Sequence, residues 1–406
     1  MIIAVAWRNI WRNKTRSLVI LIAICLGLAS GVFYMAFYKG MVDQRINTAI
    51  KTESSHIQIH HKEYLNNPDK KFVIQNSDSV INITQSVEGV KATSRRIIMN
   101  TMIQSPATSA GVKILGIVPN DEKQVTNLYS RLTEGSYFEN GKKNPIIIGR
   151  KLADKLKVKL KSKVVITLQD MAGNITGAAF KVEGIFETSN TVYDETSVFV
   201  RKSDLSRILL LDGNSCHEIA VLLDNNEQLK TAGSTLKTQL RNLDVKTWRE
   251  IMPEVNLVES SFGITMLIFI GIILLALLFG IINTMLMAVL ERTKELGMLM
   301  AIGMNKIKVF NMILLETVML SLFGGTCGIL LGWILNLWFG VKGIDLGAWS
   351  AAYKSMGFDT LVYTKLTVSV SLEIAGMVIV TGILAAIYPA MKALRLKPAE
   401  AIRIDM

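Results

Sequence analysis

Histidine and cysteine are the side chains in this sequence that could hold a metal, and both are scarce. Three of the four histidines fall in the stretch SHIQIHH, residues 55–61, and the three cysteines lie far apart. Zinc sites usually need three or four convergent ligands, and no CxxC or Cys/His spacing of that kind occurs. The alternation of Ile57 and Ile59 with polar residues instead predicts a strand with its histidines on an exposed face. We therefore expect no metal site, with a histidine site on this strand as the alternative.

Motifs of catalysis are also missing from the sequence. There is no phosphate-binding GxxxxGK[ST], no nucleophile elbow and no HExxH. Scattered aspartates and glutamates are typical of the solvated faces of an ordinary domain. We therefore expect no catalytic residue and no cofactor on this chain.

A charged segment, ERTKELGMLMAIGMNK (291–306), is the remaining candidate for a functional contact. It follows 29 residues without a charge, 262–290, and leads into another apolar segment. A short helix with charged residues and an apolar face suits the groove of a partner protein, although it would also suit the membrane surface. The residues available for such a contact are four charged, four apolar and two glycines: Glu291, Arg292, Lys294, Glu295, Leu296, Leu299, Met300, Ile302, Gly297 and Gly303.

The composition of the chain is typical of a protein that lies partly in a membrane and partly in water. Half of the 406 residues are hydrophobic and 19% are charged, with a net charge of +12. This is too apolar for an ordinary soluble protein and too charged for a chain that lies wholly in a membrane. The basic residues are spread out and form no nucleic-acid recognition motif, so they suit cytoplasmic flanks and anionic lipid better than nucleic acid.

Four segments are long and apolar enough to span a bilayer, which needs roughly 20 apolar residues. Basic residues flank the N-terminus, the 291–308 link and the C-terminus, which predicts that all three are cytoplasmic. The fold class is therefore a membrane protein with four transmembrane helices and a large extracytoplasmic α+β domain between the first and second. The expected segments are an amphipathic N-terminal helix (1–16), the first span (17–39), the outer domain (40–258), a stalk with the second span (259–290), the charged cytoplasmic helix (291–306), the third span (307–341), an outer loop (342–366), the fourth span (367–391) and a cytoplasmic tail (392–406).

Glycines recur at four-residue spacing within two of the predicted spans. Small residues at this spacing let helices approach closely in lipid. The candidate packing positions are Gly27 and Gly31 on the first span and Gly324, Gly328 and Gly332 on the third. Glu316, at the cytoplasmic edge of the third span, is expected to reach the membrane interface.

The outer domain mixes strand and helix patterns. Residues 145–158 read as a strand, a glycine turn and an amphipathic helix, and 163–169 and 180–186 alternate as strands. Residues 197–211 run from strand to helix with Ser203 or Asp204 as the expected N-cap, and 218–248 read as a β-α-β unit.

Two cytoplasmic motifs resemble those of a known family. The segment 291–306 is similar to the "ERT+E+G+LRA+G" signature of MacB/FtsX-type ABC transporter permeases, with Met300 in place of the usual arginine. The tail PAMKALRLKPAEAIR (389–403) resembles their "PA-x-RA-x-R-x-x-P-x-EALR" ending. The tail positions that carry this match are Pro389, Arg395, Pro398, Ala401 and Arg403. Patches at 114–122, 147–158, 184–195 and 247–254 resemble the lipoprotein-releasing, Lol-type branch.

The resemblance implies a mechanism and a set of partners. The permease pairs with a second permease subunit, either another copy or a paralogue, in the bacterial inner membrane with its large domain in the periplasm. A separate cytoplasmic ABC ATPase dimer binds ATP and Mg²⁺, and 291–306 acts as the coupling helix in its groove. In the Lol branch the cargo is a lipoprotein drawn from the outer leaflet between the first and second spans, and a periplasmic chaperone receives it.

Three other functions remain as alternatives. A MacB-like exporter of peptides or small amphiphiles would use the same parts, although MacB-type chains usually carry their ATPase at the N-terminus. An FtsX-like regulator would signal to a cell-wall hydrolase, but its outer domain is usually shorter. A sensor without transport would have no ATPase partner.

Overall fold

The computed structural model describes residues 8, 12, 14–139 and 143–394, and these form two compact units. The helical unit comprises Met1–Val42, Ser260–Asp345 and Leu361–Met406, and the inserted domain comprises Asp43–Glu259 and Leu346–Thr360. Part of the predicted outer loop 342–366 therefore groups with the inserted domain.

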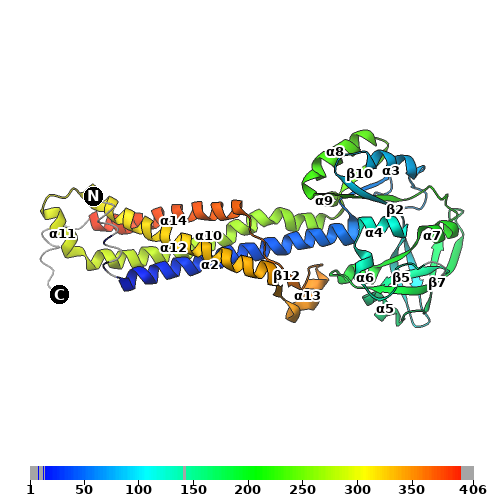
Figure 1. The fold of residues 1–406 in the computed structure, drawn as a ribbon, viewed down its shortest axis with the longest axis horizontal. Coiled ribbons are helices and arrows are strands. Elements are labelled where there is room, and N and C mark those ends of the chain that lie inside the picture. The colour runs from blue at the N-terminus through cyan, green and yellow to red at the C-terminus, as the bar shows by residue number, and fades with distance from the viewer. Residues whose placement is uncertain (1–7, 9–11, 13, 140–142, 395–406) are drawn as a thin grey trace. The chain divides into compact units, whose positions relative to one another are not determined.

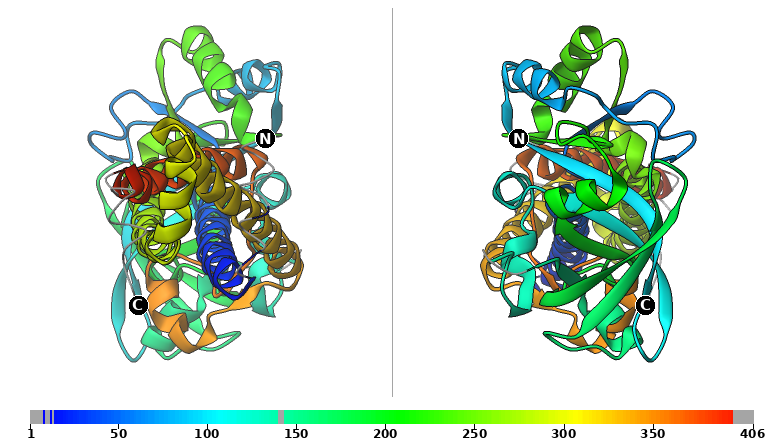
Figure 2. Two further views of the ribbon diagram at one scale, coloured as in Figure 1. Left: turned by 90° about the vertical axis from the view of Figure 1, so that its left-hand side faces the viewer. Right: turned by 90° about the vertical axis from the view of Figure 1, so that its right-hand side faces the viewer.

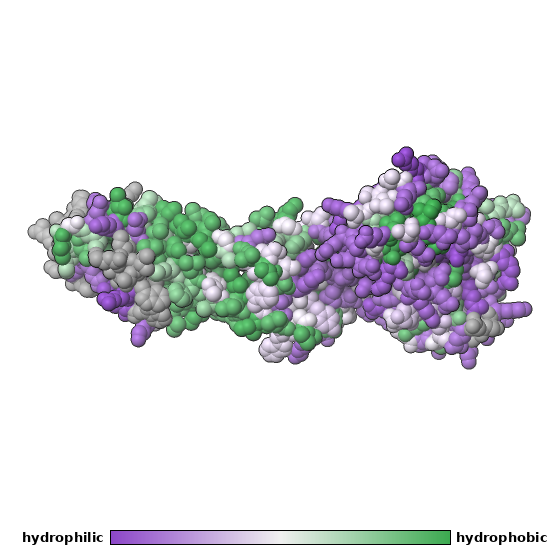
Figure 3. Space-filling view, turned by 45° about the horizontal axis from the view of Figure 1, so that its top comes forward, coloured by the Kyte–Doolittle hydropathy of each residue, from purple (hydrophilic) through white to green (hydrophobic). Residues whose placement is uncertain are grey.

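The helical unit is built on four long helices that lie side by side along their lengths (Figures 1 and 2). They are α2 (Lys14–Thr48), α10 (Pro253–Glu291), α12 (Lys306–Lys342) and α14 (Val368–Leu394), and the short α11 (Thr293–Ala301) joins α10 to α12. All four are long and apolar enough to cross a membrane, so the four apolar helices predicted from hydropathy are present. On the face shown in Figure 3 the surface of these helices is largely hydrophobic, whereas that of the inserted domain is largely hydrophilic.

Helix α10 extends well beyond a simple span. Its 39 residues correspond to about 58 Å, roughly twice the hydrocarbon core of a bilayer. It begins at Pro253, a residue whose fixed φ suits the first position of a helix. The helical pattern predicted to run back before residue 262 is therefore present.

The predicted glycine positions lie at helix–helix contacts. A Cβ added to Gly324, Gly328 or Gly332 would come within 3.0 Å of residues on α2, and a Cβ on Gly27 or Gly31 would come within 3.1 Å of Leu277 or Ile273 on α10. The three glycines of α12 thus form the surface on which α2 packs, while the two of α2 face α10.

Replacing Gly328 by alanine is expected to destabilise the helical unit. The new Cβ would lie 2.8 Å from the carbonyl oxygen of Cys25, a backbone atom that cannot turn aside. Overpacking of this kind typically costs about 1–3 kcal/mol. The measurement is the thermal unfolding midpoint of the full chain in detergent. Gly376→Ala, where nothing lies within 4 Å of the added Cβ, is the matched control. Equal midpoints for the two variants would contradict the assigned packing.

The inserted domain is organised by one mixed sheet. Its strands are β1 (Ile57–His61), β2 (Val90–Gln104), β3 (Ser109–Ile117), β4 (Leu132–Gly135), β5 (Pro145–Gly149), β6 (Lys163–Gln169), β7 (Ile175–Phe186), β8 (Ser197–Arg201), β9 (Glu218–Leu223) and β10 (Leu243–Thr247). The order is β10-β1-β9-β2-β3-β8-β5-β7-β4, and β6 pairs with both β2 and β7. Because β6 bridges these two strands, β2, β3, β8, β5, β7 and β6 close into a ring around a core of aliphatic side chains.

Short helices surround this sheet (Figure 2). They are α3 (Ser77–Gln85), α4 (Pro119–Val125), α5 (Arg150–Leu156), α6 (Thr191–Thr196), α7 (Lys202–Leu209), α8 (Leu229–Gln239), α9 (Trp248–Ile251) and α13 (Ser350–Ser355). A single π-helical turn, η1 (Ala49–Ser54), follows α2, and three 3₁₀ turns are η2 (Leu128–Arg131), η3 (Asn226–Gln228) and η4 (Gly347–Trp349). The ribbon β11 (Ile344–Asp345) with β12 (Leu361–Val362) belongs to the helical unit.

Most strands predicted for the domain are present. Strands β5, β6, β8 and β9 and helix α5 lie within the ranges predicted for them, and the α+β class is confirmed. The predicted β-α-β unit is split, because β9 and β10 both pair with β1, which lies between them. The expected N-cap of α7 is wrong: the helix begins one residue before Ser203, with Arg201 at the N-cap and no side-chain cap.

The prediction that the histidines of β1 lie on an exposed face is also wrong. His60 of β1 and His56, which directly precedes it, are buried, because segments from elsewhere in the chain cover their side chains. His60 Nδ1 lies 3.1 Å from the carbonyl oxygen of His217, and its ring stacks on Tyr64. Burial lowers the pKa of His56 and of His217 to about 4, so both are neutral near pH 7. Among the described residues no three His, Cys, Asp or Glu side chains are placed to hold a metal.

We predict that the stability of the inserted domain depends on pH through the buried carboxyl group of Asp194 in α6. Burial raises its pKa to about 6, against the hydrogen bonds that its carboxylate accepts from Thr188. A carboxyl whose folded pKa is raised contributes stability below its unfolded pKa of about 4, and this stability is lost as the pH rises through about 6. Relative to the Asp194→Asn variant, the free energy of unfolding of the natural chain should therefore fall by up to about 3 kcal/mol between pH 4 and pH 7. Denaturant unfolding of both chains across this range is the measurement, and a constant difference would contradict the assignment.

Candidate functional site

The predicted contact segment forms a short helix at one end of the helical unit. Helix α10 ends at Glu291, Arg292 takes the N-cap position, and α11 runs from Thr293 to Ala301. The helical part is thus shorter than the predicted 291–306, and residues 302–305 form the turn into α12.

Gly303 ends this helix. Its φ of +101° lies in the region that favours glycine, and nothing surrounds the position where a Cβ would lie. Met304 N donates to Leu299 O at 3.0 Å, and Gly303 N donates to Met300 O at 3.1 Å. These two bonds make a Schellman motif, which fixes the direction of the chain as it turns into α12.

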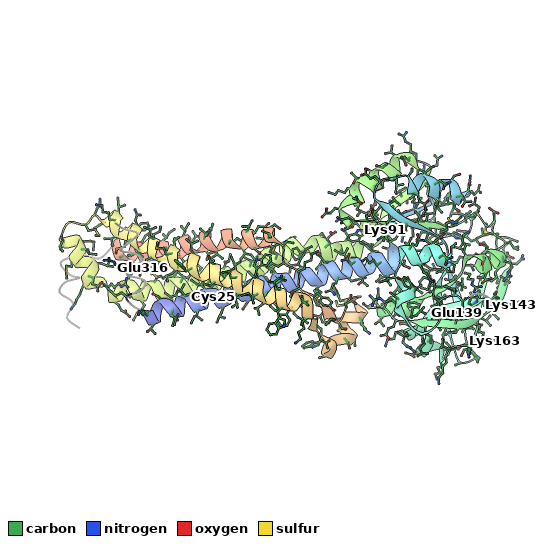
Figure 4. All side chains as sticks on the ribbon, viewed as in Figure 1. Cys25, Lys91, Glu139, Lys143, Lys163 and Glu316 are labelled. Atoms are coloured by element: carbon green, nitrogen blue, oxygen red, sulfur yellow. The ribbon has the colours of Figure 1, made fainter. Side chains whose placement is uncertain are left out.

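An ion pair with little solvent exposure anchors the start of α11. Arg292 Nη1 donates to Glu316 Oε1 on α12 at 3.1 Å, and the two side chains are 14% and 8% exposed. Figure 4 labels Glu316 on α12, close to the α11 end of the helical unit. The carboxylate of Glu316 therefore turns toward the guanidinium of Arg292 and is largely covered by protein.

A second ion pair is exposed. Arg12 Nη2 donates to Glu295 at 2.7 Å and 2.5 Å, and both side chains are about half exposed. Exposed pairs of this kind stabilise a protein by at most about 1 kcal/mol and weaken in salt. The pair therefore places Arg12 beside α11 without locking it there.

The four charged groups of these two pairs surround a cavity of about 440 Å³ under α11. Methionines from α10 and α12, Met285 and Met312, line its apolar wall. Flexible methionine side chains can repack when a partner binds.

The apolar face predicted for this segment is only partly correct. Leu296 and Gly297 are buried against the helical unit, Leu299 and Met300 are half-buried, and the predicted residue that stands free is Ile302, at 79% exposure. Met298, which the sequence did not single out, is 56% exposed. Lys294, Met298 and Ile302 follow one another at four-residue spacing, so they share the outward face of α11. We call these three residues the α11 face.

The tail motif is divided by the described range. Pro389 lies inside α14 and is buried, whereas Arg395, Pro398, Ala401 and Arg403 lie outside the described residues. The N-terminal segment 1–16 is described only at residues 8, 12 and 14–16.

Comparison with protein families accounts for this architecture. A family model described as the MacB-like periplasmic core domain matches residues 17–239, and one described as the FtsX-like permease C-terminal region matches residues 267–398. The chain belongs to the MacB/FtsX-type ABC transporter permeases. The FtsX-like match includes α11, so the helix with the Arg292–Glu316 pair lies in a region that defines the family.

Individual relatives of this permease are distant. The uncharacterized ABC transporter permease MJ1507 of Methanocaldococcus jannaschii is 26% identical over 67% of this chain and 65% of its own length. The lipoprotein-releasing system transmembrane protein LolC of Neisseria meningitidis is 23% identical over 82% of this chain and 83% of its own length. The crystal structure of the extracellular domain of the transporter YknZ, from Gram-positive bacteria, covers 47% of this chain at 17% identity and a TM-score of 0.34.

Proposed function

We propose that this permease is the membrane subunit of an ABC transporter that extracts lipoproteins from the membrane, using ATP hydrolysed by a separate chain. The observation that carries this proposal is an apolar groove between α2 and α10. It has a volume of about 370 Å³ and is lined by residues between 19 and 30 on α2 and between 273 and 284 on α10.

The groove suits an acyl chain. Its lining is almost wholly aliphatic, and the small residues Gly27, Ala276 and Gly280 leave space along it. Each methylene of a lipid chain that leaves water contributes about 0.8 kcal/mol, but a chain in lipid gains nothing further from an apolar wall. The groove would therefore receive acyl chains from the bilayer at little energetic cost and release them when the helices move.

Movement would start at α11. An ATPase dimer that closes on ATP and Mg²⁺ would draw the α11 face with it, and the buried Arg292–Glu316 pair would carry α12 along. Helix α10 is unbroken from Pro253 to Glu291, so it would transmit the displacement along its length. Because helices are stiff on this scale, a rigid rotation of α10 would close the groove from one side.

The remaining parts of the proposal concern partners and location. A second permease subunit, identical or paralogous, would complete the transporter in the bacterial inner membrane. The basic flanks favour a cytoplasmic location for both termini, and the inserted domain would then face the periplasm. A periplasmic chaperone would accept the lipoprotein, and the similarity to the lipoprotein-releasing protein LolC supports a lipoprotein as the cargo.

Export of peptides or small amphiphiles is the second candidate, because the same groove would admit any slender apolar molecule. Signalling to a cell-wall hydrolase, the third, would need the α11 face but not the groove. Filling the groove should therefore remove lipoprotein extraction or the export of amphiphiles but leave signalling to a hydrolase intact.

The test is a tryptophan scan of α10. Ala276→Trp would fill the groove, whereas Leu275→Trp is a matched control at a neighbouring residue that is 60% exposed and does not line it. In proteoliposomes with the ATPase, Ala276→Trp should reduce ATP-dependent release of a triacylated lipoprotein by about tenfold, or roughly 1.4 kcal/mol, and Leu275→Trp should not. Equal release by both variants would contradict the groove as the cargo site. No release by the natural chain, with export of small amphiphiles intact, would favour the second candidate.

A further inference from the structure

A cavity of about 460 Å³ that is open to solvent lies in the inserted domain, apart from the groove and from α11, and its lining residues Asn100 and Lys113 are exposed. It is lined by residues of β1, β2, β3, β8 and β9 and of the segments that precede and follow them. One part of its wall is apolar, with Leu65, Ile98 and Met252. The volume falls within the range of about 300–1,000 Å³ that is typical of small-molecule sites.

Three polar side chains meet in the cavity from neighbouring strands. Lys113 of β3 is paired in register with Asn100 of β2 on one side and with Ser197 of β8 on the other. All three residues line the cavity. Within residues 14–139 and 143–394 none of these three side chains makes a direct hydrogen bond or ion pair. An ammonium, an amide and a hydroxyl therefore face one space with their donors available.

The carboxylates of the same wall are already engaged. Glu218 Oε1 accepts from Arg96 Nη1 at 2.7 Å, and Glu53 Oε1 accepts from Arg45 Nη1 at 2.9 Å. Each of these carboxylates is thus paired with a guanidinium. Glu218 affects Lys113 only through a longer-range electrostatic interaction. The donors that remain in the cavity are suited to a negatively charged group rather than to a cation.

The surroundings of Lys113 also favour a negatively charged ligand. Its ammonium is reached by solvent through the cavity, yet protein surrounds it, and this desolvation lowers the pKa of Lys113 below its usual range. An anion next to the ammonium would favour the charged form again, because opposite charges attract and charge-assisted hydrogen bonds are stronger than neutral ones.

We propose that this cavity binds a small molecule with an oxyanion, a carboxylate or phosphate group, on a short apolar body. Lys113, Asn100 and Ser197 hold the oxyanion, and the apolar wall holds the remainder of the molecule. The site goes beyond the proposed extraction of lipoproteins and does not depend on it.

The position of the cavity gives such a ligand access to both connections of the domain. Ser54, which also lines it, is the last residue of η1, and Met252 directly precedes α10. A bound molecule would therefore touch the segments through which the chain enters and leaves the inserted domain.

The experiment uses the full chain in detergent and four probes of one size: hexanoate, hexyl phosphate, hexanamide and hexylamine. Affinities are measured by titration calorimetry. The variants are Lys113→Met, which removes the ammonium, and Ser197→Ala, which removes only a hydroxyl. Lys91→Met and Lys163→Met, at two exposed lysines labelled in Figure 4, are matched controls for the loss of one positive charge. Thermal unfolding without probe shows whether each variant is folded.

We expect hexanoate or hexyl phosphate to bind and both neutral and cationic probes to bind at least about tenfold more weakly, since charge-assisted hydrogen bonds contribute roughly twice as much as neutral ones. Lys113→Met should abolish this preference, Ser197→Ala should weaken it, and the two controls should keep it. The better of the two anions identifies carboxylate or phosphate as the natural group. Equal binding of hexanamide, or an unchanged preference in folded Lys113→Met and Ser197→Ala, would overturn the proposal.

Discussion

Placing aspartate at both Met298 and Ile302 is expected to uncouple this permease from its ATPase. Both side chains are largely exposed on the α11 face, and neither contributes to the core of the helical unit. Hot-spot residues, the few that carry most of the energy of an interface, cost about 2 kcal/mol or more each when truncated, and a buried carboxylate without a partner costs further. Cargo-stimulated ATP hydrolysis should fall by more than about tenfold, because 1.4 kcal/mol corresponds to a factor of ten.

The measurement is ATP hydrolysis by the reconstituted transporter, together with co-purification of the ATPase. Met356→Asp is the matched control, since Met356 is 70% exposed in the inserted domain and lies outside the α11 face. Membrane insertion and thermal stability should be the same in all three chains. If the doubly substituted permease retains stimulated hydrolysis, α11 is not the coupling helix, and the segment is an amphipathic link that lies on the membrane.

Replacing Glu316 by alanine is expected to reduce stability and coupling together. The carboxylate is buried and accepts from Arg292, so its removal leaves a guanidinium without this partner in a poorly solvated place. Breaking a buried ion pair typically costs about 3–5 kcal/mol. The free energy of unfolding in detergent should fall by that amount, and stimulated ATP hydrolysis should fall with it.

Two further variants separate this effect from the loss of any carboxylate. Glu295→Ala removes the exposed partner of Arg12 and should change the free energy of unfolding by less than about 1 kcal/mol. The exchanged pair Arg292→Glu with Glu316→Arg should recover part of the stability lost in Glu316→Ala. An exchanged pair that is no better than Glu316→Ala would show that the site needs more than the two opposite charges.

Much of the architecture can be predicted from local sequence. The four spans follow from runs of apolar residues, since a bilayer demands continuous helices of a fixed minimum length. Strands β5, β6 and β8 were visible because each alternates or is bounded by a turn residue. The glycine repeat of α12 predicted a close helix contact, and the partner helix could not be named because spacing on one helix says nothing of its neighbour.

The misplaced residues share a physical cause. His60 on β1 and His56 just before it lie in a stretch that alternates like a surface strand, yet both side chains contact residues about 160 positions later, His217 and Leu223. Glu316 pairs with Arg292, a partner on another element that the sequence of its own helix does not reveal. Pairings between distant segments decide burial, and local periodicity does not contain them.

The sequence alone determined that this chain has four apolar helices, a large domain inserted between the first two, and a charged helix between the second and third, because each depends on hydropathy and spacing within one segment. Only the tertiary structure decided which residues of that helix stand free, since Leu296 packs inward while Met298 and Ile302 face out. It also decided that β6 closes a ring of strands and that Lys113, Asn100 and Ser197 meet in one cavity. These arrangements arise from strand register and helix contacts between segments far apart in the chain, which is where side-chain burial is finally set.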